Sequence, residues 1–115
     1  LSSDSAWQQL TWHLLPSANN SDALVLELDN PSPFYINLQR AYVLTQGAVA
    51  PEAASAPVLQ TVMLAPFARE RFEVLPAARA QAKAASALRL QIINDYGGVS
   101  QLDVNQATPV VKTQP

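Results

Sequence analysis

Apolar and polar residues alternate along several short segments of this chain. In residues 24–29, leucine occupies every second position, with Glu27 between two leucines and Asp29 after the last one. A period of two is typical of a β-strand that buries one face. The same pattern predicts seven strands, at residues 10–14, 24–29, 34–38, 58–64, 72–74, 88–95 and 99–104.

Proline and changes of parity mark where these strands end or bend. Residues 30–33 (NPSP) end the second predicted strand, because proline cannot donate a hydrogen bond to a neighbouring strand. In the third strand, Arg40 breaks the alternation that leads from Ile36 towards Leu44. We therefore predict a β-bulge or a strand end at residues 39–41.

Three segments have no strand pattern. Residues 46–57 are rich in alanine, proline and serine, which predicts a long surface connection. Residues 77–87 are dominated by alanine, which favours helix, but they lack an apolar stripe. We expect a mobile loop or one or two helical turns there, and a frayed tail at residues 110–115.

Seven short strands without a long helix predict an all-β fold, an immunoglobulin-like antiparallel β-sandwich of about 100 residues. The chain has 115 residues and no cysteine. We therefore expect a single domain whose sheets are held together by packing alone. The residues predicted to form the core are Trp12, Leu26, Ile36, Phe72, Leu90 and Leu102.

Composition narrows the classes of function. Hydrophobic residues make up 49% of the chain and charged residues 14%, which is typical of a folded globule and not of a disordered chain. A formal net charge of -2 lacks the basic surface that binding to nucleic acid needs. No apolar run is long enough to span a membrane, and the N-terminus lacks a secretion signal, so we expect a mature chain or an excised domain.

No group of residues suggests catalysis or metal binding. His13 is the single histidine and falls on the polar face of the first predicted strand, so we expect it at the surface and predict no zinc site. Motifs for nucleophilic catalysis and for phosphate or dinucleotide binding are absent from the sequence. Glu70 and Glu73 are interpreted as solvated charge, and Arg69 and Arg71 as charge that protects a sheet edge. The chain is predicted not to be an enzyme and to use no cofactor.

Residues 92–98 (IINDYGG) predict a strand that runs into a tight turn. Asn and Asp side chains hydrogen-bond to nearby backbone, and glycine adopts a positive φ without strain. Asp95 follows a buried strand, so we expect it either to cap its own turn or to reach a cation on another domain. Tyr96 is expected to pack against the turn.

Four motifs, taken together and in order, resemble one protein family. They are residues 30–38 (NPSPFYINL), 63–67 (MLAPF), 75–76 (LP) and 93–98 (INDYGG). The family is the C-terminal domain of the periplasmic chaperones that assemble pili in the chaperone-usher pathway. The connections at residues 46–57 and 77–87 look longer than is usual in that family.

The resemblance implies a function. Chaperones of this family are two-domain proteins of the bacterial periplasm that bind pilus subunits and deliver them to an outer-membrane usher. Their N-terminal domain donates a strand to the incomplete subunit, and nothing in this chain matches that domain. Residues 1–115 are therefore expected to be the second domain alone, which completes the subunit-binding cleft. The aspartate of the INDYGG motif, here Asp95, is implied to join an ion-pair network with an arginine and a glutamate of the first domain.

The first motif suggests two kinds of role. Asn30, Pro31 and Pro33 are interpreted mainly as residues that fix a loop, because proline presets the backbone geometry. Tyr35 and Asn37 face outward beside that loop, which makes them candidates for contact with a partner.

Asn94 and Tyr96 complete the set of motif residues that could face a partner. An alternative function is a free-standing immunoglobulin-like adhesion or carbohydrate-binding module, which the outward-facing Tyr35 and the long loops would suit. A third class, an enzyme, would depend on His13 and the scattered carboxylates.

Overall fold

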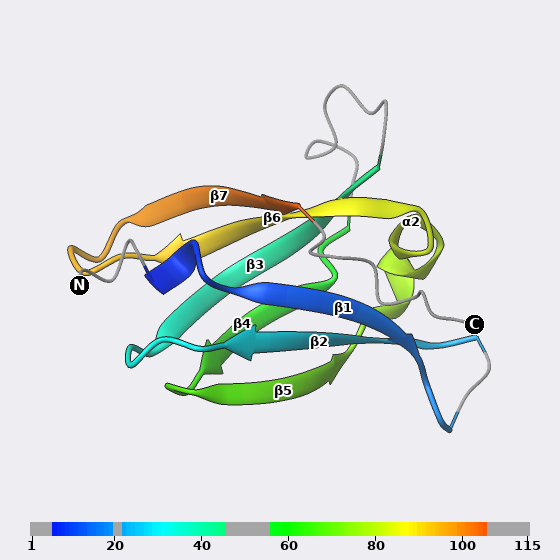
Figure 1. Cartoon of the computed structure of the whole chain (residues 1–115). Helices are drawn as coiled ribbons and strands as arrows, with labels where there is room; N and C mark the ends of the chain where they lie inside the picture. Colours follow the sequence, from blue (N-terminus) through cyan, green and yellow to red (C-terminus); the bar gives the residue numbers. More distant parts are fainter. Residues whose placement is uncertain (1–5, 20–21, 46–55, 106–115) are drawn as a thin grey trace.

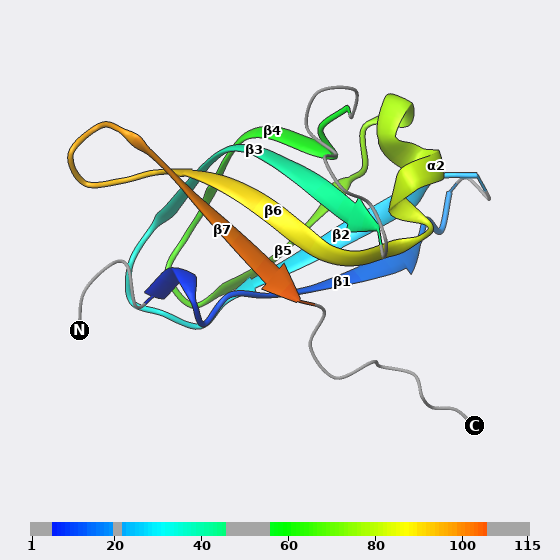
Figure 2. The ribbon, with the colours of Figure 1, turned by 90° about the horizontal axis from the view of Figure 1, so that it is seen from above.

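The computed structural model describes residues 6–19, 22–45 and 56–105 and folds them into two antiparallel sheets (Figure 1). One sheet has the strand order β1-β2-β5, with β1 (Thr11–Pro16), β2 (Leu24–Asn30) and β5 (Ala68–Glu73). The other has the order β4-β3-β6-β7, with β4 (Leu59–Leu64), β3 (Ile36–Thr45), β6 (Ala85–Ile93) and β7 (Val99–Asn105). The sheets stack as two layers (Figure 2). The predicted all-β, immunoglobulin-like sandwich of seven strands is confirmed.

The core lies between the two sheets and is built from their inward-facing side chains. Four of the predicted core residues are 0% exposed, namely Trp12, Leu26, Ile36 and Leu90. Phe72 and Leu102 pack against this core but stay partly exposed. They lie on β5 and β7, which are edge strands, so their side chains have neighbours on one side only. Burial of one large apolar side chain contributes about 1.5 to 3 kcal/mol of stability.

Residues 77–87 contain both helical turns and the start of a strand. A 3-10 turn, η1 (Pro76–Ala78), leads into α2 (Arg79–Ala82), which confirms the predicted helical turns. The end of the segment departs from the prediction, because β6 already begins at Ala85, which pairs with Thr45 of β3. Cross-strand pairing therefore extends the sheet into a stretch whose composition favours helix.

The predicted bulge in β3 is confirmed by a shift in its register with β6 between Leu38 and Arg40. Several strand ends differ from the prediction by two or more residues. Beyond the bulge β3 continues to Thr45, past the predicted residue 38, and β6 ends at Ile93, before the predicted residue 95. β3 begins at Ile36, two residues late, and β5 begins at Ala68, where the sequence pattern offers no large inward-facing residue. Two predicted features lie wholly or largely outside the described residues, namely the tail at 110–115 and the connection at 46–57.

A tryptophan ties the two sheets together along one side of the sandwich. The indole Nε1–H of Trp12 on β1 donates a hydrogen bond of 3.0 Å to the carbonyl oxygen of Val104 on β7. Both strands are edges of their own sheets. In a chain without cysteine, this bond links the layers in addition to apolar packing.

Candidate functional site: an interaction surface

The β6–β7 turn is built by Asn94. Its side-chain Oδ1 accepts hydrogen bonds of 3.0 Å from the backbone N–H groups of Tyr96 and Gly98, and its Nδ2 donates to Ser100 Oγ at 3.0 Å. Its own N–H donates to the carbonyl oxygen of Gly98 at 2.9 Å. Gly97 adopts φ +83°, a conformation that strains other residues. One asparagine therefore fixes this turn through both its side chain and its backbone.

Asp95 and Tyr96 lie at the exposed tip of this turn. The side chain of Asn94 accepts the hydrogen bonds from the backbone N–H groups of Tyr96 and Gly98 in this turn. The prediction that Tyr96 packs against the turn is wrong, because its side chain is 97% exposed. Since Asn94 already satisfies the backbone of the turn, both following side chains project outward.

The first motif forms a buried clamp between two loops. The side chain of Asn30, which is 0% exposed, donates from Nδ2 to the carbonyl oxygens of Phe34 at 2.7 Å and Ala65 at 3.0 Å. Its Oδ1 accepts from both the N–H and the hydroxyl of Ser32, at 3.1 and 2.7 Å. The Ser32 carbonyl in turn accepts from the N–H of Phe67 at 3.0 Å. The clamp joins the β2–β3 loop to the β4–β5 turn.

These bonds support the interpretation of Asn30, Pro31 and Pro33 as residues that fix a loop. The two prolines are exposed, whereas Asn30 before them and Ser32 between them are buried. The clamped loops hold two aromatic side chains in solvent, Tyr35 at 61% and Phe67 at 71% exposure. The clamped loops and the β6–β7 turn lie at the same end of the sandwich, on the left in Figure 1.

An apolar row crosses the outer face of the four-stranded sheet at this end. Met63 of β4 pairs with Asn37 of β3, and Ile93 of β6 pairs with Val99 of β7. The register of β3 with β6 places Asn37 beside Ile93. Met63, Ile93 and Val99 are 58%, 41% and 52% exposed. We call Met63, Asn37, Ile93 and Val99 the apolar row.

A shallow hollow of about 130 Å³ opens within the apolar row. It is lined by Asn37, Leu38, Thr61, Val62, Met63 and Ile93. Exposed apolar side chains gathered on one face, with one amide among them, are suited to contact with another protein. Four of the lining residues are apolar, and Asn37 and Thr61 add an amide and a hydroxyl that can form hydrogen bonds.

The backbone of Thr61 is strained where it lines the hollow. Its φ is +53°, in the left-handed region that β-branched residues avoid. Thr61 lies in β4, an edge strand, and stands opposite Gln39, the residue at which the register of β3 with β6 shifts. Such outliers gather at functional sites, because selection for the side chain there outweighs the backbone strain.

Thr61→Asn should raise the free energy of unfolding by about 1 kcal/mol, because asparagine tolerates left-handed backbone better than threonine. Urea denaturation of the 115-residue chain measures the change. Thr11→Asn is the matched control, since Thr11 lies in β1, with no such φ, and asparagine is disfavoured in strands. Stabilisation by the control, or destabilisation of equal size by both variants, would contradict the strain at Thr61.

Within the described residues, no group of three or more His, Asp or Glu side chains is placed to hold a metal ion. His13 is half-buried and not at the surface as predicted, and its buried Nδ1 makes no hydrogen bond. In the same part of the chain, no helix has the length and apolarity needed to cross a membrane.

The family model for the C-terminal domain of the pili assembly chaperone PapD matches residues 5–104. The chain belongs to this family. Among solved structures, the CupB2 chaperone of Pseudomonas aeruginosa is similar, with a TM-score of 0.59 and 27% identity over 90% of this chain. The match covers 42% of the CupB2 chain, so the present chain spans less than half of that protein. A comparison with curated proteins finds no match.

Membership of the pilus chaperone family confirms the resemblance drawn from the four motifs. It favours a chaperone domain over a free-standing adhesion or carbohydrate-binding module, and the family is not an enzymatic one. Two of those motifs, residues 30–38 and 63–67, meet in the clamp around Asn30.

Sequence reasoning proposed Tyr35, Asn37, Asp95 and Tyr96 as residues that face a partner, and it did not single out the other members of the apolar row, Met63, Ile93 and Val99. Asn37 belongs to the row and is partly exposed. A signal for the others was present, because Met63 and Ile93 each follow an apolar residue and so fall on the polar side of an alternating strand. An apolar residue out of phase marks an exposed apolar face when the strand belongs to a two-layer sandwich.

Proposed function

We propose that this chain is the second domain of a two-domain periplasmic chaperone that binds pilus subunits and delivers them to the outer-membrane usher. In this proposal the domain completes the subunit-binding cleft and orients the N-terminal, strand-donating domain. The observation that carries it is the apolar row, which stands beside the β6–β7 turn, at the same end of the sandwich as the clamped loops.

The apolar row suits contact with an incompletely folded protein. A chaperone has to cover apolar surface that its client leaves exposed, and a complementary apolar face does this without sequence-specific hydrogen bonds. The row offers three large apolar side chains on one face of the sheet, and the Asn37 amide among them can form hydrogen bonds. The similar CupB2 chaperone is more than twice as long as the matched region, which supports the presence of a further domain in the intact protein.

Asp95 is the residue proposed to pair with cations of the N-terminal domain. Asn94 holds the turn, so Asp95 is presented at a fixed position on the surface and next to the apolar row. A carboxylate on a rigid turn loses little conformational freedom when it forms an ion pair. Such a pair, shielded between two domains, would fix their relative angle.

The test uses the intact two-domain protein with Asp95→Asn. Loss of the charge should broaden the distribution of interdomain distances in small-angle X-ray scattering and lower the melting temperature of the intact protein. The same substitution in the 115-residue chain measures what Asp95 contributes within this domain, and the intact protein should lose more stability than the isolated chain does. Asp103→Asn is the matched control, since Asp103 pairs with Arg89 inside this domain at 2.9 Å. Identical scattering of the Asp95 variant and the wild-type protein would rule out the interdomain pair.

A second experiment tests whether capture of a pilus subunit requires the N-terminal domain. The intact protein should capture a denatured pilus subunit as it refolds, whereas the 115-residue chain alone should not. A stable complex between the isolated chain and a subunit would show that strand donation by another domain is not required.

A further inference from the structure

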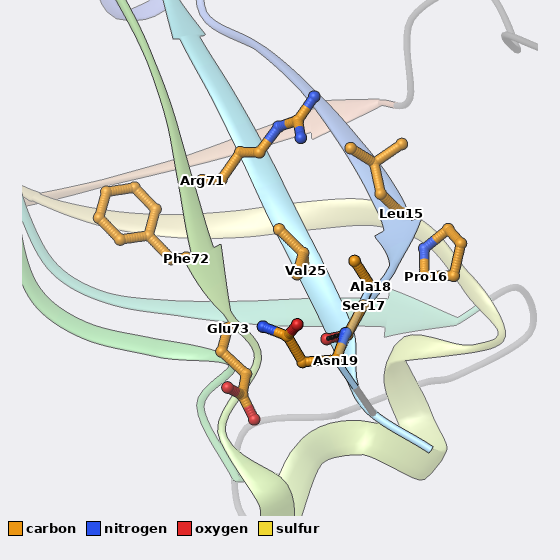
Figure 3. A pocket seen from close by; sticks show the side chains of 9 residues that line it. All are labelled: Leu15, Pro16, Ser17, Ala18, Asn19, Val25, Arg71, Phe72 and Glu73. Carbon is orange, nitrogen blue, oxygen red and sulfur yellow. Dashed lines mark hydrogen bonds between the residues drawn. The ribbon is translucent and has the colours of Figure 1, made fainter. Parts of the chain in front are cut away.

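A second hollow, of about 260 Å³, lies on the outer face of the three-stranded sheet, in the layer opposite the apolar row. It is bordered by the loop that follows β1 and by the end of β5 (Figure 3). Leu15 and Val25 pair across β1 and β2 and form an apolar floor, and Glu73 of β5, which pairs with Val25, borders it. None of the four family motifs lines this hollow.

Arg71 stands over this floor with most of its donors unused. Its Nε donates to Glu27 Oε2 at 2.9 Å, and its side chain is 66% exposed. Within the described residues, its two Nη groups make no hydrogen bond to the protein. Figure 3 shows the guanidinium extending over β2 towards Leu15. The two Nη groups can therefore donate hydrogen bonds to both oxygens of a carboxylate, in a bidentate arrangement, while Nε keeps its bond to Glu27.

The acidic groups at the hollow already have partners. Glu73 accepts a hydrogen bond of 3.1 Å from Arg79 Nη2, and Glu27 is paired with Arg71. Their charge is thereby offset, which lowers the repulsion of an incoming anion. At the other end of the hollow, the Asn19 backbone N–H donates to Ser17 Oγ at 3.2 Å, which shapes the loop and leaves the Asn19 amide exposed.

We propose that this hollow binds an aliphatic carboxylate, with the carboxylate on the Arg71 Nη groups and the aliphatic group over Leu15 and Val25. The Asn19 amide is placed to meet a polar group at the far end. The hollow is smaller than the roughly 300 to 1,000 Å³ of drug-sized sites, which suits a ligand of the size of one amino-acid residue. The inference does not depend on the chaperone function, since it uses the opposite layer of the sandwich.

The experiment titrates N-acetyl-valine into the isotope-labelled 115-residue chain and follows backbone NMR shifts. Shifts should concentrate at Leu15, Val25 and Arg71, with a dissociation constant on the order of 1 mM for so small a ligand. N-acetyl-valinamide has the same side chain and acetyl group but a neutral amide in place of the carboxylate, and it should bind at least tenfold more weakly. Equal shifts with acid and amide, or no saturable shifts with the acid, would overturn the proposal.

A matched pair of variants tests the role of the arginine. Arg71→Gln should weaken N-acetyl-valine binding at least tenfold, while glutamine can still donate to Glu27. Arg69→Gln is the control, because Arg69 lies on the same strand and face and pairs with Asp29 at 3.3 Å but does not line the hollow. Equal loss in both variants, or no loss in Arg71→Gln, would overturn the assignment.

A third probe, isovalerate, distinguishes the source of the carboxylate. Binding of both acids indicates a site for free short-chain acids, and binding of N-acetyl-valine alone indicates the end of a polypeptide. Both results support the carboxylate site. If an arginine variant fails to fold, the comparison of N-acetyl-valine with N-acetyl-valinamide on the wild-type chain still decides whether the site exists.

Discussion

Asn30→Ala should lower the free energy of unfolding by about 3 to 4 kcal/mol. The Asn30 side chain makes four hydrogen bonds in a fully buried position, two as donor and two as acceptor. A hydrogen bond contributes about 1 kcal/mol net, and a buried group left without its partner costs about 1 to 3 kcal/mol more. Two of the bonds reach backbone carbonyls, of Phe34 and Ala65, and alanine leaves these without that partner. Urea denaturation of the 115-residue chain measures the loss.

Asn19→Ala is the control for this prediction. Asn19 is also a loop asparagine, but it is exposed, and its hydrogen bond to Ser17 uses the backbone N–H, which alanine keeps. Its substitution should change stability by less than about 0.5 kcal/mol. If Asn30→Ala is equally mild, the clamp does not hold the two loops together, and the exposed positions of Tyr35 and Phe67 need another explanation.

The strands were predictable because their physical signal is local. Alternation alone located β2 and β4, and the broken parity at Arg40 located the bulge, since a two-layer sandwich buries one face of each strand. The start of β6 was missed because Ala85 becomes a strand residue by pairing with Thr45, a partner forty positions earlier. Local composition carries no information about such a partner.

The candidate site was predictable in its motifs but not in its bonding. The sequence indicated that Asn30 fixes a loop, yet its bond to the carbonyl of Ala65 joins residues 35 positions apart, so the link between two motifs is visible only in three dimensions. For the β6–β7 turn, both Asn94 and Asp95 could serve as the cap by residue type. The backbone geometry places Asn94 in that position, and this leaves Asp95 exposed.

The residues of the clamp are expected to contribute mainly to stability, and the residues of the apolar row mainly to binding. The clamp is buried and polar, so its loss should unfold or loosen the domain. The apolar row is exposed, so its side chains contribute less to folding than the buried core does, and large apolar residues persist there at the expense of solubility. A substitution in the row can therefore remove binding without removing the fold.

Ile93→Glu in the intact two-domain protein should reduce capture of a pilus subunit at least tenfold. The side chain is 41% exposed in this domain, so glutamate remains hydrated while the protein is free. If a client covers the apolar row, that carboxylate must lose its water without a cation nearby in the row, which is strongly unfavourable. The amount of complex recovered by size-exclusion chromatography after a denatured subunit refolds with the chaperone measures the effect.

Asn105→Glu is the matched control for Ile93→Glu, since it adds the same charge at the far end of β7, where the side chain is exposed and outside the apolar row. This variant should capture subunits as the wild-type protein does. Both variants should keep the wild-type circular dichroism spectrum, because neither replaces a fully buried residue. If both variants capture subunits normally, the apolar row does not face the client, and the proposed cleft must be formed by another face of the domain. If both lose capture equally, the loss comes from added negative charge on the sheet and not from the apolar contact.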